Sequence, residues 1–203
     1  YIYKEETMTK IKSLFISLVL TLGVSTAIAG SHGSTLDIVK ERGKLMCGSN
    51  TGLAGFGNPN DAGVWEGIDV DVCRAVAAAV FGDANAVEFV PTTSKVRFTV
   101  LQSGEIDMLS RNTTWTLQRD VELGLEFVGV NYYDGQGFMV PASLGVSSAS
   151  ELDGASVCIQ VGTTTEMNLA DFFSANGMSY EAVPVETNSE ADAAYTAGRC
   201  DVY

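Results

Sequence analysis

The sequence predicts an α/β fold with mostly parallel sheets flanked by helices, and three observations point to it. From residue 43 onward, short β-type runs alternate with runs of helical periodicity. Glycines such as Gly82 and Gly104 stand where the helical runs end. The alternation occurs in two blocks, residues 34–133 and 142–203. Strands separated by crossover helices favour parallel pairing, because each helix returns the chain to the same end of the sheet.

Three strands and two helices are expected in the first block. The strands are residues 44–49, 86–90 and 106–109. The first helix covers residues 70–81, and Gly82 suits its C-terminal cap. Its apolar residues Val72, Val76, Ala79 and Val80 are expected to share one face. The second helix follows a Ser94 cap and runs through residue 101 to Gly104.

The second block repeats the pattern. Its strands are expected at residues 155–160, 182–185 and 200–202. Thr163 and Glu166 have the spacing of a capping box, so a helix should begin there. Asn188 or Ser189 caps the next helix.

The stretch that joins the blocks, residues 132–141, is β-type and contains glycine. Because it lacks Ser/Pro repeats, an extended crossing strand is favoured over a flexible linker. The sequence stops within its last expected strand, which would leave a buried sheet edge unpaired. We therefore expect it to be the N-terminal part of a longer protein.

The first 29 residues resemble an export signal. Met8 precedes two lysines, an apolar run covers residues 14–24, and residues 27–29 read Ala-Ile-Ala, a small-x-small cleavage site. The run is short for a membrane span, although an uncleaved anchor is the alternative. We expect residues 1–7 to be untranslated upstream sequence and residues 8–29 to be a signal peptide.

Composition argues against several kinds of protein. The formal net charge is −13 without a cluster of Lys or Arg, so no nucleic-acid partner is expected. Neither GxGxxG nor GxxxxGK[ST] occurs, so a phosphate cradle is missing. His32 is the single histidine and there is no CxxC. We therefore expect no metal, no cofactor and no catalytic residue.

Export also bears on the four cysteines, which are Cys47, Cys73, Cys158 and Cys200. In an oxidising compartment, bridged cysteines are favoured over free thiols. Four cysteines allow three pairings, and their spacing alone does not choose among them.

Three loops follow expected strands, where open α/β sheets bind their ligands. They are residues 49–60, 111–119 and 162–165. Arg119 and a helix start at Thr164 could hold the carboxylate of a small zwitterion, and Thr114 could accept a hydrogen bond from its ammonium group. Spacing alone nevertheless favours Arg119 as a solvated helix residue paired with Asp120 or Glu122. These residues by themselves indicate an α/β binding module.

Longer stretches resemble the periplasmic binding proteins of general L-amino acid ABC transporters, within bacterial solute-binding protein family 3. The matching stretches are WEGIDVDVCRAV (65–76), LQSGEIDML (101–109), LSRNTTWT (109–116), YYDGQGFMV (132–140), ASVC (155–158), GTTTE (162–166) and AGRCDVY (197–203). The likeness covers residues 34–203.

The resemblance implies a type II periplasmic binding protein, in which two lobes close over a free L-amino acid and deliver it to the membrane permease of an ABC importer. Lobe 1 would comprise residues 34–133, lobe 2 residues 142–203, and residues 132–141 would cross between them. A segment returning to lobe 1 would lie beyond the sequence. The resemblance also implies a periplasmic monomer that is not an enzyme.

The resemblance assigns the binding residues as follows. In relatives, an arginine three residues after a threonine holds the substrate carboxylate, and Thr116 and Arg119 show this spacing. Thr114, the main chain at Asn112 and the helix start at Thr164 match the neighbouring polar positions.

The sequence differs from the family's pattern at the residue that covers the substrate side chain. An aromatic residue of relatives aligns with Leu53, so Phe56 or Trp115 is expected to take its place. The acidic residue that holds the substrate amino group would follow Tyr203.

The resemblance also bears on the disulfides. Because a bridge between the two implied lobes would oppose their opening, the pairs Cys47–Cys73 and Cys158–Cys200 are expected.

Two other functions are compatible with this fold. The first is an enzyme, such as a periplasmic dehydratase or the sensor lobe of a transglycosylase, which would need an acid or base in the cleft. The second is the ligand-sensing ectodomain of a receptor, which would need a membrane segment further along the chain.

Overall fold

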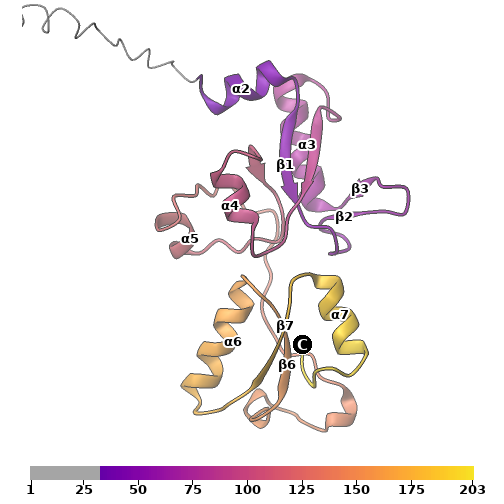
Figure 1. Cartoon of the computed structure of the whole chain (residues 1–203), viewed down its shortest axis with the longest axis vertical. Helices are drawn as coiled ribbons and strands as arrows, with labels where there is room; N and C mark the ends of the chain where they lie inside the picture. The colour runs from indigo at the N-terminus through magenta and orange to yellow at the C-terminus, as the bar shows by residue number, and fades with distance from the viewer. Residues whose placement is uncertain (1–32) are drawn as a thin grey trace, which may run out of the picture. The chain divides into compact units, whose positions relative to one another are not determined.

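The computed structural model describes residues 33–203, which contain two parallel sheets with helices packed on them (Figure 1). The expected upstream residues 1–7, the expected signal peptide 8–29 and His32 lie outside the described part. Among residues 33–203, no helix combines the length and the apolar character that a membrane span needs.

The first sheet has the strand order β4-β1-β5, and both pairings are parallel, as predicted. Its strands are β1 (Leu45–Ser49), β4 (Val87–Pro91) and β5 (Met108–Leu109). Leu45 pairs with Val87, and Gly48 pairs with Leu109. The carboxyl ends of these strands therefore meet at one edge, which is where the first two expected binding loops begin.

Helices of the first block are α2 (Thr35–Arg42), α3 (Ile68–Phe81), α4 (Arg97–Gln102) and α5 (Leu117–Val121). A short antiparallel pair, β2 (Asn58–Pro59) with β3 (Trp65–Glu66), lies between β1 and α3 in the chain. Gly82 ends α3 in the left-handed conformation, as expected.

The apolar face expected for α3 is only partly buried. Val76 and Val80 are half-buried and pack against the core formed by Val39, Leu45 and Ala77, whereas Ala79 is exposed. Val70, Cys73 and Ala77 are fully buried, and the Cys47–Cys73 bridge joins this side of the helix to β1.

The expected Ser94 cap of α4 was also wrong. The helix begins at Arg97 after Val96, which makes no side-chain capping bond. The Ser94 hydroxyl instead accepts a hydrogen bond from Nη2 of Arg111 at 3.2 Å. A contact to a distant loop has thus replaced a local cap.

The second sheet pairs β6 (Ser156–Gln160) with β7 (Glu181–Val185) in parallel. These strands lie between α6 (Thr164–Ala175) and α7 (Asn188–Thr196) (Figure 1). The core on the α6 side is built from buried apolar residues, namely Leu152, Val157, Ile159, Leu169, Phe173 and Val202. The turns η1 (Ala142–Leu144) and η2 (Ala149–Glu151) precede β6.

Capping in the second block follows the prediction at one helix and differs at the other. Thr163 caps α6 by accepting the N–H of Glu166 at 3.1 Å. The cap of α7 is Thr187, which forms a capping box with Glu190, and not Asn188 or Ser189. The expected strand 200–202 is reduced to a parallel bridge between Val202 and Val157.

Residues 132–141 do not form the expected strand and have no regular secondary structure. Within this stretch, Met139 exchanges two backbone hydrogen bonds with Tyr203, at 2.6 and 2.9 Å. The second half of this stretch therefore lies beside the chain end of the second block.

Both disulfides follow the pairing that the resemblance implied. Cys47 of β1 is bridged to Cys73 of α3, with 6.2 Å between the Cα atoms. Cys158 of β6 is bridged to Cys200, with 5.6 Å between the Cα atoms. Each bridge stays within one block, so neither restricts movement between the blocks.

Candidate functional site

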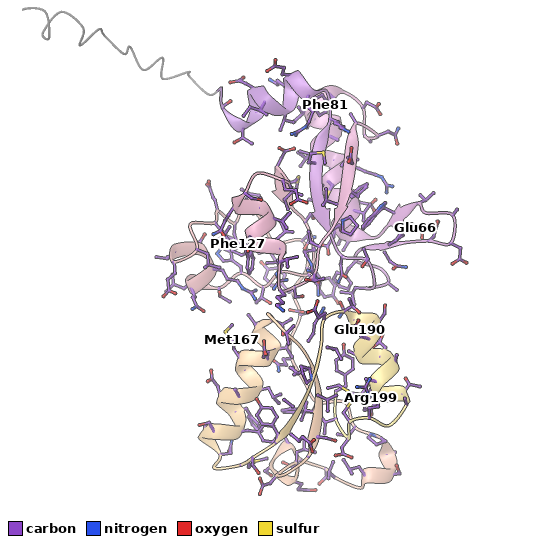
Figure 2. The ribbon with its side chains drawn as sticks, viewed as in Figure 1. Glu66, Phe81, Phe127, Met167, Glu190 and Arg199 are labelled. Carbon is purple, nitrogen blue, oxygen red and sulfur yellow. A yellow bond between two sulfur atoms is a disulfide. The ribbon has the colours of Figure 1, made fainter. Side chains whose placement is uncertain are left out.

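The loops at the carboxyl ends of the strands border a cavity of about 1410 Å³. Five of the six expected binding residues line it, namely Phe56, Asn112, Thr114, Trp115 and Thr164. Arg119 does not; it lines a separate hollow of about 220 Å³, together with Phe98 and Met167, which Figure 2 labels.

Thr114 and Thr164 come together from different blocks. Thr114 lies in the loop after β5, and Thr164 is the first residue of α6. Their hydroxyl oxygens are 3.1 Å apart. The first N–H groups of a helix lack intrahelical partners and carry partial positive charge. A carboxylate placed here could accept bonds from both hydroxyls and from the start of α6.

Arg119 lies behind Thr114. Its Nη1 donates to the Thr114 carbonyl at 2.8 Å, and its guanidinium carbon is 5.1 Å from the centre of the Phe98 ring. Thr116 caps α5 by accepting the Arg119 N–H, which explains the Thr-x-x-Arg spacing locally. The side chain is buried, and burial lowers the pKa of Arg119 below its usual value.

Arg97 is a cavity residue that the sequence did not reveal. It is 1% exposed, and its Nη1 donates to the Asn112 carbonyl and to the Thr113 hydroxyl, both at 3.1 Å. Its Nε is buried without a hydrogen-bond partner. Burial, together with the charges of Arg111 and Arg119, lowers the pKa of Arg97 to about 9, so it is still a cation at neutral pH.

Arg111 is a second buried cation that was missed. Its Nη1 donates to the Thr92 carbonyl at 3.1 Å, and its Nη2 donates to Ser94 Oγ and to Asn112 Oδ1. Burial lowers the pKa of Arg111 to about 10, partly offset by the negative charge of Asp69. Its contacts brace the loops that follow β4 and β5.

We call Arg97, Arg111 and Arg119 the arginine cluster. Within residues 33–203, none of the three forms a salt bridge. Buried cations without a paired carboxylate are unfavourable unless an anion binds beside them. One signal could have found Arg97: a cation in the first turn of a helix opposes the helix dipole and so requires another reason to be there.

Asparagine amides connect three loops around the cavity. Asn50, which follows β1, donates through Nδ2 to Asn112 Oδ1 and to Asn188 Oδ1, each at 3.0 Å. Asn188 is the first residue of α7. The side-chain oxygen of Asn112 therefore accepts from Asn50 and Arg111, and its main-chain carbonyl accepts from Arg97.

Two aromatic pairs lie along the cavity. Phe56 meets Tyr132 edge to face at 4.9 Å between ring centres, and Trp115 stacks on Phe127 at 5.3 Å. The backbone at Phe56 lies close to Gly67, where a side chain would collide with the Phe56 carbonyl. Leu53 is not part of the cavity lining. Phe56 and Trp115, the expected candidates for covering a ligand side chain, both line the cavity.

Asp69 is a buried acid beside the cavity. Its Oδ1 accepts a hydrogen bond from Asn131 Nδ2 at 2.7 Å, and its Oδ2 is buried without a partner. Burial raises the pKa of Asp69, although Asn131 and the charge of Arg111 oppose the increase. The carboxyl therefore anchors the segment before residue 132.

Replacing Asp69 with asparagine should stabilise the protein more at neutral pH than in acid. A raised pKa means that the folded state binds the Asp69 proton more tightly than the unfolded state does. The contribution of Asp69 to the free energy of unfolding therefore falls as pH rises through the pKa of the folded state. Asparagine removes this dependence and keeps an acceptor for Asn131. Thermal unfolding of both proteins from about pH 4 to neutral pH measures the difference, and a difference independent of pH would contradict the assignment.

No group of His, Cys, Asp or Glu within the described residues could hold a metal ion. Hydroxyls, amides, guanidinium groups and aromatic rings line the cavity, together with the carboxylates of Asp69, Asp107, Glu126 and Asp134. The hydroxyls and guanidinium groups suit the recognition of an anionic group that carries an organic side chain.

Comparisons with known proteins give consistent results. The family described as bacterial extracellular solute-binding proteins, family 3, matches residues 45–151. The glutamate/glutamine/aspartate/asparagine-binding protein BztA of Rhodobacter capsulatus is 59% identical over 184 residues, which is 90% of this chain and 54% of that protein. The general L-amino acid-binding periplasmic protein AapJ of Rhizobium johnstonii is 58% identical over 91% of this chain and 53% of its own.

A solved structure agrees with these relatives. It is an ABC transporter periplasmic binding protein from Brucella ovis with glutathione bound, with 59% identity and a TM-score of 0.79. The match covers 85% of this chain and 54% of that one. The chain spans about half the length of the curated relatives named above.

Proposed function

Because the chain belongs to family 3 of the bacterial extracellular solute-binding proteins and has a type II periplasmic binding protein fold, we propose that it provides the binding cleft of a protein that captures free L-amino acids. That protein would deliver them to the permease of an ABC importer. Relatives named for binding amino acids support this proposal.

The observation that carries the proposal is the arginine cluster beside Thr114 and Thr164. Three buried guanidinium groups without a salt bridge among the described residues favour a ligand that brings a carboxylate. We propose that the two hydroxyls and the N-terminus of α6 bind this carboxylate. Arg119, which donates a hydrogen bond to the Thr114 carbonyl, would supply positive charge beside it.

We further propose that the first block is lobe 1 and the second block lobe 2, with residues 132–141 crossing between them. A ligand that contacts Thr114 and Thr164 touches both blocks. It would favour a closed arrangement only to the extent that it makes contacts absent from the open one. Phe56 and Trp115 would cover its side chain.

The remaining parts of the proposal are export, oligomeric state and the absence of catalysis. Residues 8–29 would direct the protein to the periplasm and be removed, and the protein would act as a monomer. Asp69 lines the cavity, but its Oδ2 is buried without a hydrogen-bond partner and its Oδ1 accepts a hydrogen bond from Asn131. We therefore propose binding without catalysis.

Calorimetric titration of the protein expressed from its complete gene tests the function. We expect at least one of the common L-amino acids to bind with a Kd in about the micromolar range or tighter. The corresponding α-carboxamide should bind far more weakly, because it cannot pair with a guanidinium. A protein that binds no L-amino acid, or that binds the amide equally well, would contradict the proposal.

A further inference from the structure

The turn after β6 brings Gly162 against the backbone of the first block. A Cβ atom at Gly162 would lie 2.9 Å from Lys95 Cα, and 3.1 Å from both Lys95 N and the Ser94 carbonyl oxygen. Carbon atoms in ordinary contact lie about 3.5–4.0 Å apart. All three of these neighbours are main-chain atoms, so no side-chain rotation can relieve the collision.

The same peptide is fixed by hydrogen bonds from both sides. Arg97 Nη2 of the first block donates to the Gly162 carbonyl at 3.3 Å. The Gly162 N–H donates to Glu166 Oε2 within α6, at 2.8 Å. Because Arg97 also donates to the Asn112 carbonyl, one guanidinium group joins the loop after β5 to the turn after β6.

We propose that Gly162 and Arg97 form an inter-block clasp, which sets how closely the two blocks approach and thereby whether Thr114 and Thr164 can reach the same ligand. This inference rests on the proposed function. Thr164 lies two residues after Gly162, and Thr114 lies two residues after Asn112, so the clasp controls the spacing of the two hydroxyls.

A methyl group at position 162 would act as a wedge. It would hold the blocks about half an ångström or more further apart to restore normal carbon contacts. The Arg97 bond, already 3.3 Å long, would then exceed normal hydrogen-bonding distance. The two threonine hydroxyls, 3.1 Å apart, would separate as well.

Gly52 provides a contrast at another contact between the blocks. A Cβ atom there would lie 2.6 Å from Ser189 Oγ, and the nearest backbone atom of Ser189 would be 3.6 Å away. A hydroxyl group can rotate aside, whereas the backbone at Lys95 cannot. We therefore expect Gly52→Ala to affect binding much less than Gly162→Ala.

The matched control for Gly162→Ala is Gly154→Ala. Gly162 and Gly154 have φ values of +75° and +79°, so alanine at either position incurs a similar left-handed strain of about 1 kcal/mol. A Cβ atom at Gly154 would meet nothing within 4 Å. The two variants thus share the backbone penalty and differ in the collision with the other block.

The experiment uses the protein expressed from its complete gene, with L-glutamate and L-glutamine as probes. Calorimetry measures the affinity, small-angle scattering measures the radius of gyration, and thermal unfolding checks that both variants lose similar stability. We expect the Kd of the Gly162→Ala variant to be at least about tenfold higher than that of Gly154→Ala. Its radius of gyration should also decrease less when the amino acid is added. Equal affinity and equal compaction in the two variants would overturn the clasp.

Failure of the proposed function would look different. In that case the unmodified protein binds neither probe, and scattering of the two variants without ligand decides the clasp by itself. A larger radius of gyration for Gly162→Ala than for Gly154→Ala supports the clasp, and equal radii overturn it.

Discussion

Replacing Arg119 with alanine is expected to weaken amino-acid binding at least about a hundredfold. The substitution removes a buried cation whose charge supports the proposed carboxylate site. It also removes the 2.8 Å bond that holds the Thr114 carbonyl, so the Thr114 hydroxyl would lose its position. Calorimetric titration of the protein expressed from its complete gene measures the loss.

Arg199→Ala is the control for charge, because Arg199 is exposed and lines neither the cavity nor the smaller hollow. It removes the same charge and should leave affinity within about twofold of the unmodified protein, since exposed charges interact weakly through water. Unchanged affinity in Arg119→Ala would remove that residue from the site.

Arg97→Ala in parallel shows which cation faces the ligand. Arg97 lines the cavity, whereas Arg119 lines the adjoining hollow. A large loss of amino-acid affinity in Arg97→Ala, with little loss of affinity in Arg119→Ala, would indicate that Arg97 binds the ligand carboxylate. Comparable losses would indicate that the arginine cluster acts as one positively charged unit.

Removing the Cys158–Cys200 bridge is expected to lower the free energy of unfolding by about 4 kcal/mol, because it releases a loop with a sequence separation of 42 in the unfolded chain. For a protein of this size, such a loss lowers Tm by about 8–16 °C. Thermal unfolding of the Cys158→Ala/Cys200→Ala double variant measures the effect. An unchanged Tm would show that the bridge does not form or does not stabilise the protein.

The Cys47→Ala/Cys73→Ala double variant is the natural comparison. Its separation of 26 predicts a loss of about 3.5 kcal/mol, slightly smaller than for the other bridge. Because each bridge lies within one block, neither double variant should affect how the blocks close. The compaction caused by amino acid should therefore persist in both variants at temperatures where they remain folded.

Local sequence signals predicted the parallel strands and four of the helices, although α2, α5, β2 and β3 were not expected. The expected strands 44–49 and 155–160 correspond to β1 and β6, and the pairings β1–β4, β1–β5 and β6–β7 are parallel. The Thr163 cap and the Gly82 terminus were also correct. These features depend on residues only a few positions apart, so the information needed to predict them is contained in a short window.

Predictions failed where a distant partner competed with the local signal. Ser94 has the chemistry of a cap, yet its hydroxyl accepts a bond from Arg111, which lies 17 positions away. At Ser94 a long-range contact thus outweighed a capping preference that is favourable by only about 1 kcal/mol. The most buried side of α3 likewise carries Cys73, whose bridge to Cys47 joins positions 26 residues apart.

The candidate site divides in the same way. Motif resemblance selected Thr114, Thr164 and Arg119, and the structure brings these three close together, although their binding roles are still proposals. Arg97 had no motif to mark it. Its importance comes from being 1% exposed and from joining two loops that are remote in sequence, which no local pattern records.

The order of the expected strands and helices, the helix ends at Gly82 and Thr163 and the loops that follow the strands can be read from the sequence, because periodicity and capping act over one or two turns. Tertiary structure alone decides which cations are buried together, which face of α3 meets the sheet, and that Gly162 lies against Lys95. These features depend on contacts between segments far apart in the chain, and the energies of such contacts arise only when those segments pack together.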